Sequence, residues 1–365
     1  MSAAAWEDEP PTGRFDDDAL PADIATGDVF DRPDRKSELA MHERPQDEGA
    51  PDLPRLDALI EPAIDRAERR TKGIERPVPL PWPMLSGHFG GGLWPGVHYV
   101  VSGTGIGKTA LALQWALHAA RADIPALYIG LELEPMQIAL RVIGEAAGVP
   151  WSTLYTGQAG PALIKRARDA VPKMCGLPLH VVLARPQGWP SSDLPPLVAA
   201  MRAVYPEPDG PGSAPLLVVV DFLQIIGDEP DANGRSLDLR ERIGRAAYRS
   251  RDVASHFSAS VLVVSSAARD KYGQLGRVAD DAGLVWDADD RGRPIRRRVV
   301  RPDALVGLGK ESGEIEYSGD SVSVLARVPE SDVSEGGCDV FFVTAKGRAT
   351  GATWSPLHFT GHGYR

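Results

Sequence analysis

Cysteine is scarce in this chain of 365 residues, which holds only Cys175 and Cys338. Two cysteines cannot build a disulfide framework, and the eight histidines are scattered, so nothing indicates a zinc site. No stretch approaches the roughly 18 consecutive apolar residues that a membrane-spanning helix requires. The N-terminus is acidic and lacks the basic-then-apolar pattern of a secretory leader. We therefore expect a cytoplasmic protein that does not associate with membranes.

Basic residues are rare near the N-terminus, although the chain as a whole is ordinary in charge content. Residues 1–50 carry 14 Asp and Glu against 5 Lys and Arg, while the whole chain has a net charge of −10. The remainder is therefore close to neutral, and the acidity belongs to the first fifty residues. A low overall isoelectric point does not exclude a nucleic-acid partner, because local patches bind phosphates.

The first part of the chain is predicted to lie outside the main domain. Residues 1–51 mix Asp, Glu, Pro and Ala with few aromatic or β-branched residues, which is typical of a disordered acidic tail. Residues 52–74 form a linker helix or helices, since an apolar residue recurs at helical spacing and Pro62 predicts a break or kink. The apolar positions are Leu53, Leu56, Leu59, Ile60 and Ile64. This stripe could dock on a neighbouring subunit or pack on its own domain.

Residues 75–365 read as one α/β domain in which apolar strands alternate with helical segments. Strands that are apolar throughout are typical of a parallel sheet covered on both faces, so we expect a mainly parallel central sheet flanked by helices. The expected strands are 98–103, 125–132, 177–184, 215–222 and 258–266, with 321–328 and 338–346 extending the sheet. The expected helices are 108–121, 135–147, 192–204 and 236–256.

A glycine-rich loop, "SGTGIGKT", joins the first strand to the first helix. Its glycines let the backbone turn tightly with its N–H groups inward, and the following helix points its positive end at the same place. Lys108 would reach the β- and γ-phosphates of a nucleotide, and the Thr109 hydroxyl would hold Mg²⁺. Ser102 replaces the first glycine of the usual pattern, but a small residue still permits the turn. The predicted phosphate-binding residues are Ser102, Gly103, Thr104, Gly105, Ile106, Gly107, Lys108, Thr109 and Ala110.

Polar residues at the ends of other strands complete the predicted nucleotide site. Asp221 ends a buried strand, where a carboxylate meets the Mg²⁺ of the nucleotide. Glu132 ends the strand that follows the loop's helix, where it could polarise an attacking water. Glu134 is its rival, although strand register favours Glu132. Ser265 and Ser266 end a further strand and could sense the γ-phosphate or simply form a turn.

Two basic segments remain outside this site. Lys346 and Arg348 are two residues apart at the end of a strand, so both project to one side. They could reach the γ-phosphate of a neighbouring subunit, or they could form a solvated basic turn. The second segment could contact DNA phosphates, or it could be a hairpin tied by its own acids. Its arginines are Arg291, Arg293, Arg296, Arg297, Arg298 and Arg301.

Six motifs in one order resemble those of a known family. They are "SGTGIGKTALAL", "GLELEPMQIALR", "VVVDFLQII", "VVSSAAR", "GKESGEIEYSGDSV" and "VTAKGRATG". Over about residues 75–365 the chain resembles the RecA-like motor domain of hexameric replicative helicases of the DnaB type. The resemblance implies a RecA-like P-loop NTPase fold, with ATP and Mg²⁺ bound by Lys108, Thr109, Asp221 and Glu132.

The same resemblance implies roles that the residues alone do not give. Lys346 and Arg348 match the pair that enters the neighbour's nucleotide site. The "KESG" motif, with Lys310, Glu311 and Gly313, matches the central-channel loop that holds single-stranded DNA. Gln224 matches a glutamine that relays the nucleotide state to that loop.

The chain also departs from the family pattern. Ser266 stands where the family sensor usually has Gln, and Phe222 replaces a usual Tyr. An acidic tail stands in place of the family's helical N-terminal domain, which implies that the collar that recruits primase is missing.

These patterns predict an ATP-driven single-stranded DNA translocase and helicase, acting as a homo-hexamer with ATP at subunit interfaces. From the family we expect movement from 5′ to 3′ and a replication initiator or loader as partner. The alternative is an ATP-gated DNA-binding or regulatory assembly, similar to RecA or a clock ATPase, that unwinds nothing. A metabolic small-molecule kinase is a third class, but no motif for its substrate pocket occurs.

Overall fold

The computed structural model describes residues 55–183, 189–225, 234–267, 283–288, 294–299, 312–327, 337–360 and 363–365. The predicted acidic tail, residues 1–51, lies outside the described residues. None of the described helices combines the length and apolar character that crossing a bilayer demands.

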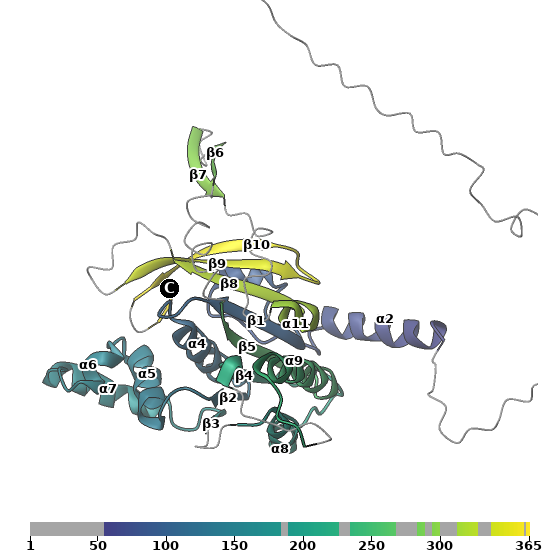
Figure 1. The fold of residues 1–365 in the computed structure, drawn as a ribbon, viewed down its shortest axis with the longest axis horizontal. Helices are drawn as coiled ribbons and strands as arrows, with labels where there is room; N and C mark the ends of the chain where they lie inside the picture. The colour runs from purple at the N-terminus through teal and green to yellow at the C-terminus, as the bar shows by residue number, and fades with distance from the viewer. Residues whose placement is uncertain are drawn as a thin grey trace, which may run out of the picture. The chain divides into compact units, whose positions relative to one another are not determined.

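The core of residues 61–365 is a sheet of eight strands in the order β10-β9-β8-β1-β5-β4-β2-β3, which Figure 1 shows from top to bottom. Neighbouring strands pair in parallel from β8 through β3, whereas β9 and β10 pair antiparallel. The mainly parallel sheet is thus confirmed, with an antiparallel extension. The strands are β1 Gly96–Ser102, β2 Ala126–Gly130, β3 Leu179–Leu183, β4 Leu217–Asp221, β5 Ser260–Ser266, β8 Ser321–Arg327, β9 Cys338–Gly347 and β10 Thr353–Phe359.

The helices follow the predicted alternation closely. The structure contains α2 Asp57–Thr71, α3 Pro83–His88, α4 Lys108–Arg121, α5 Pro135–Ala147, α6 Trp151–Tyr155, α7 Pro161–Ala170, α8 Leu194–Val204, α9 Leu239–His256 and α11 Ser312–Ser318. Helices α4 and α5 have the predicted bounds, because a glycine loop precedes the first and Pro135 starts the second. A separate antiparallel pair joins β6 Gly283–Ala288 to β7 Pro294–Val299.

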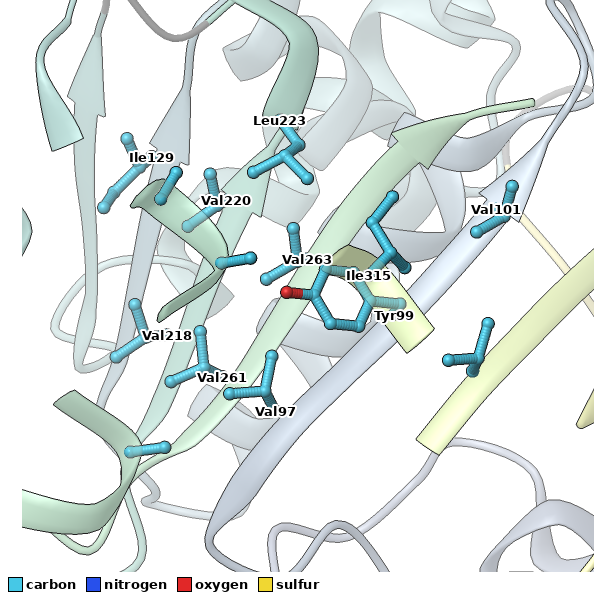
Figure 2. Close-up of a cluster of buried hydrophobic side chains, with 14 of the residues drawn as sticks. Val97, Tyr99, Val101, Ile129, Val218, Val220, Leu223, Val261, Val263 and Ile315 are labelled. Atoms are coloured by element: carbon cyan, nitrogen blue, oxygen red, sulfur yellow. The ribbon is translucent and has the colours of Figure 1, made fainter. Parts of the chain in front are cut away.

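Helices cover both faces of the sheet. One face packs against α8, α9 and α11, and its cluster includes Tyr99 of β1 beside Ile315 of α11 (Figure 2). The other face packs against α3 and α4, with Val100 of β1 in its cluster. Adjacent residues of β1 thus enter opposite layers, because side chains alternate along a strand. Both layers are apolar, which explains why the central strands are apolar throughout.

Helix α2 runs through Pro62 as one helix, so of the two outcomes considered for this proline, a break or a kink, the break does not occur. Pro62 lies in the second turn of the helix, where its missing N–H leaves the Ala58 carbonyl without its usual donor. None of the residues in α2 is buried, and Leu59, Ile60 and Ile64 are 51–54% exposed. The apolar stripe therefore remains exposed along the described helix.

The parallel register brings the ends of four strands, three of them polar residues, to one edge of the sheet. Ser102 of β1 pairs with Ser266 of β5, and Gly130 of β2 pairs with Asp221 of β4. The carboxyl ends of these strands form the edge at which ligands bind in open α/β sheets. The predicted nucleotide site is therefore a single place in the fold.

Candidate nucleotide site

The glycine-rich loop lies between β1 and α4 at this edge. Gly105 and Gly107 have φ angles of 78° and 97°, a left-handed conformation that glycine adopts without strain. Lys108 begins α4, and its Nζ donates to the carbonyl of Gly103 at 2.7 Å and to that of Ser102 at 3.2 Å. The loop therefore curls around the Lys108 ammonium at the N-terminus of a helix. Burial lowers the pKa of Lys108, while the charges of Asp221 and Glu132 oppose that shift.

A cavity of about 380 Å³ opens beside the loop. Its walls include Thr109 from α4, Glu132 after β2, Asp221 from β4 and Ser266 from β5. These side chains come from segments far apart in sequence, and only the sheet edge unites them. Glu134 is not among the lining residues and instead occupies the N-cap position of α5.

Asp221 is 2% exposed, and its two carboxylate oxygens differ in their contacts. The Tyr128 hydroxyl donates to its Oδ2 at 2.5 Å, whereas Oδ1 is buried and has no hydrogen-bond partner among the described residues. Burial raises the pKa of Asp221, and the Tyr128 bond, the Thr109 hydroxyl and Lys108 oppose the rise. A free carboxylate oxygen next to a threonine hydroxyl is an oxygen donor set that suits Mg²⁺. The residues present therefore fit a magnesium ion.

Arg141 lines the same cavity, although the sequence analysis did not select it. It projects from α5, and its guanidinium lies 4.0 Å from the ring centroid of Trp151. Burial lowers the pKa of Arg141, and the charges of Tyr128, Asp221 and Glu132 raise it. Arg141 is the one basic residue in the sequence of α5, and this isolated charge is the feature by which the sequence could have indicated it. It adds a second fixed cation to a site that would receive phosphates.

Gln224, which follows β4, is hydrogen-bonded to the end of β5, where Ser265 and Ser266 were predicted as sensors. It lies in a short 3₁₀ turn, Leu223–Ile225, directly after β4. Its Nε2 donates to Ser265 Oγ at 2.7 Å, and its Oε1 accepts from the Ser266 backbone N–H at 3.1 Å. Gln224, Ser265 and Ser266 thus form one hydrogen-bonded group, of which Ser266 lines the cavity.

Lys346 and Arg348 lie at the opposite end of the parallel strands, beside the residues with which β8 and β1 begin. The end of β9 pairs with Ser321, the first residue of β8, and β8 runs parallel to β1. The Lys346 Nζ donates to the Glu316 carbonyl, and Arg348 donates to the Tyr317 carbonyl at 2.8 Å. Both cations thus contact the C-terminal part of α11, as the predicted same-side projection requires. The length of a seven-residue strand, roughly 20 Å, separates this edge from the phosphate loop of the same chain.

The predicted DNA-contacting residues are only partly described. Lys310 and Glu311 lie outside the described residues, and Gly313 is exposed in the first turn of α11. In the arginine-rich segment, β7 carries Arg296, Arg297 and Arg298 in antiparallel register with β6. Arg291, Arg293 and Arg301 lie outside the described residues.

Solved structures share this fold. A DnaB-like replicative helicase, described with its interactions with primase, matches with a TM-score of 0.64 and 16% identity. The match covers 86% of this chain and 67% of that one. A second solved structure, described as an ATPase domain, matches with a TM-score of 0.62 and 18% identity, over 86% of this chain and 99% of that domain. These likenesses confirm the RecA-like fold.

Among curated proteins, no sequence matches this chain. A model of the DnaB-like helicase C-terminal domain matches residues 87–277, which is more than half of the chain. The matched segment contains the phosphate loop, Glu132, Asp221 and the Gln224 group. The chain is therefore a P-loop ATPase, and it belongs to the DnaB-like helicase C-terminal domain family.

Proposed function

We propose that the protein is an ATP-driven single-stranded DNA translocase and helicase that works as a homo-hexameric ring and moves from 5′ to 3′. One observation carries the proposal: the phosphate loop and the Lys346–Arg348 pair lie at opposite edges of one sheet. A subunit with its catalytic acids at one edge and this pair of cations at the other cannot complete one site alone. Subunits arranged head to tail in a ring would complete a site at every interface.

Within each site the roles follow from position. Lys108 and Arg141 would neutralise phosphate charge, and Asp221 and Thr109 would hold Mg²⁺. Glu132 would accept a hydrogen bond from the attacking water and orient it. When bound, Mg²⁺ supplies charge neutralisation at the β- and γ-phosphate oxygens. The Gln224 group would sense whether the γ-phosphate is present, because it joins the cavity wall to the end of β4.

Arg348, supplied by the next subunit, would stabilise the charge that develops on the transferred phosphoryl group. An arginine in this role contributes about 10³-fold or more to turnover in other nucleotide hydrolases. Lys346 would act beside it. This arrangement makes hydrolysis depend on assembly, so a free subunit would bind ATP without turning it over rapidly.

Ring assembly has further support from α2, and the DNA contacts are part of the proposal. The exposed apolar stripe of α2, with Leu59, Ile60 and Ile64, needs a partner surface, and a neighbouring subunit would supply one. Lys310, Glu311 and Gly313 would contact single-stranded DNA in the channel, and the arginine-rich segment would add phosphate contacts. A replication initiator or loader is the expected further partner. Interactions with primase are described for one of the matching helicases.

A regulatory, ATP-gated DNA-binding assembly is the second candidate. Ser266 favours it, because serine replaces the family's sensor glutamine and offers a shorter, weaker link to the DNA loop. Such an assembly would hydrolyse ATP slowly and would unwind nothing.

Strand displacement on partial duplexes with a single tail, in the presence of ATP and Mg²⁺, separates the two candidates. The substrates carry either a 5′ or a 3′ single-stranded tail, and Lys108→Ala is run beside the wild type. Unwinding by the wild type alone, on the 5′-tailed substrate, supports the proposal. ATPase activity that ignores single-stranded DNA, with no unwinding, supports the regulatory assembly. Unwinding only from a 3′ tail would contradict the proposed direction of movement but would still support an ATP-driven helicase.

A further inference from the structure

Tyr364 lies against the outer side of the phosphate loop. Its ring is 2% exposed, and its hydroxyl donates to the backbone carbonyl of Ile106. The ring packs edge-on against Trp82, and Phe359 lies at 5.0 Å between centroids. A Cβ atom on Gly107 would lie 2.6 Å from the Tyr364 hydroxyl, so glycine is required there by contact as well as by φ. The loop and this tyrosine are therefore fitted to each other.

The segment that carries Tyr364 is fixed to the helix that follows the loop. Gln114 of α4 accepts from the Tyr364 N–H at 2.7 Å and donates to the Tyr364 carbonyl at 2.8 Å. A backbone bridge pairs Tyr364 with Phe359, the last residue of β10, and Phe359 lines the nucleotide cavity. Burial raises the pKa of the Tyr364 phenol, so it stays protonated and keeps its donor. The Tyr364 end of its hydrogen bond to Ile106 is thus held in place.

The position of this bond has a geometric consequence. In a trans peptide the C=O and N–H groups point in opposite directions. The Ile106 carbonyl points outward to Tyr364, so the N–H of the same peptide, on Gly107, points to the opposite side. Gly107 lines the nucleotide cavity, whereas Tyr364 does not. The Gly107 N–H is therefore aimed towards the place where phosphate would bind.

We propose that Tyr364 is a positioning residue for nucleotide binding: its hydroxyl holds the Ile106–Gly107 peptide so that the Gly107 N–H is preset for the phosphates. The inference rests on the proposed nucleotide site. A donor that is fixed before the ligand arrives strengthens binding, because no ordering cost remains at that moment. The proposal concerns affinity for phosphates and assigns Tyr364 no part in cleaving them.

The test compares the full chain with Tyr364→Phe, which removes the hydroxyl and keeps the buried ring. We expect the Kd for fluorescent mant-ADP with Mg²⁺ to rise about fivefold, the value of one lost hydrogen bond. The KM for ATP should rise in parallel, while kcat at saturating ATP should change less than about twofold, since the bond acts on binding. Adenosine, which has no phosphates, should displace mant-ADP with an unchanged inhibition constant. A purely structural loss would weaken adenosine and ADP alike.

Two further variants serve as a control for the loss of a hydroxyl and as a test of what holds Tyr364. Tyr248→Phe removes a hydroxyl from an exposed tyrosine of α9 and should bind mant-ADP as the wild type does. Gln114→Leu releases the Tyr364 backbone and should weaken mant-ADP binding in the same direction as Tyr364→Phe. Wild-type affinity in Tyr364→Phe, or equal losses for ADP and adenosine, would overturn the positioning role alone. The proposed site, and this inference with it, would be overturned if the wild-type protein failed to bind mant-ADP. The same holds if the wild type and Lys108→Ala bound mant-ADP with equal Kd.

Discussion

Arg348 and Asp320 are joined by an ion pair of 3.1 Å, and the same carboxylate accepts from the backbone N–H of Val97 at 2.9 Å. Asp320 thereby connects the arginine to the first residues of β1. The fit is close, because a Cβ on Gly96 would lie 2.6 Å from Asp320 Oδ2. β1 leads at its other end into the phosphate loop. One strand therefore connects the arginine at the far edge to the subunit's own nucleotide site.

We expect Arg348→Ala to reduce ATP turnover by about 10³-fold, because the transition-state charge loses its arginine. ATP binding within the same subunit should stay near the wild-type level, since Arg348 lies at the far edge. Steady-state ATPase assays and mant-ATP titrations measure the two quantities separately. Arg168→Ala, which removes an exposed arginine of α7, is the matched control and should leave both unchanged.

Mixed rings test whether Arg348 acts between subunits. Lys108→Ala and Arg348→Ala are each expected to be inactive alone. Mixed, they place an intact phosphate loop opposite an intact arginine at some interfaces, so a fraction of the activity should return. A mixture as inactive as its two components would contradict the shared site.

The sequence predicted those features that local patterns control. The bounds of α4 and α5 follow from glycine, proline and apolar periodicity within each segment. β10 was not among the predicted strands, and Pro356 within its sequence is a residue that argues against a central strand. The structure places β10 at an edge of the sheet, where a missing N–H is tolerated. Whether a strand can contain a proline depends on its position in the sheet, and a local sequence pattern does not give that position.

In the candidate site, too, some residues could be predicted from local sequence patterns and others could not. The phosphate loop and Asp221 have signals within a few residues, so both could be selected from sequence. Tyr364 contacts Gln114 and Ile106 across separations of 250 and 258 residues, and no local pattern announces such contacts. Arg141 is similar, since its role depends on α5 turning it towards β4. Contacts between distant segments appear only when the fold brings the segments together.

Glu132 and Glu134 form a matched pair for testing the catalytic base. Glu132→Gln should lower kcat by about 10²-fold or more while mant-ATP still binds, because the amide cannot polarise water as a carboxylate does. Glu134→Gln should remain near the wild type, since the Glu134 side chain makes no capping hydrogen bond to α5 and does not line the cavity. ATPase rates at saturating ATP measure both. Loss of activity in Glu134→Gln with an active Glu132→Gln would reverse the assignment.

Tyr128→Phe tests the state of Asp221 through pH. Burial already raises the pKa of Asp221, and the Tyr128 hydrogen bond lowers it by stabilising the carboxylate. Removing that bond should raise the pKa further, so the acid limb of kcat/KM should move to higher pH. The alkaline limb should stay in place. Profiles of kcat/KM against pH at fixed Mg²⁺ measure the shift, and an acid limb that moves to lower pH would contradict this account.

His98 gives a prediction about folding that is independent of activity. Its Nε2 lies 2.9 Å from the Trp94 carbonyl and must donate, so Nδ1 accepts from the Ser321 hydroxyl in the neutral ring. Burial lowers the pKa of His98, while the Trp94 bond and the Asp320 charge oppose the shift. As the pH falls below the unfolded value of about 6.5, the unfolded chain takes up a proton before the folded one does.

The free energy of unfolding should therefore be constant for this group above about pH 6.5 and should fall below it, by up to about 1.4 kcal/mol per pH unit. His98→Gln keeps a donor and an acceptor but does not titrate, so its stability should depend less on pH between about 7 and about 5, the range in which histidine titrates. Urea unfolding across that range measures the difference in slope. His180→Gln, at an exposed position of β3, should keep the wild-type slope. Parallel profiles for wild type and His98→Gln would show that His98 carries no proton-linked stability.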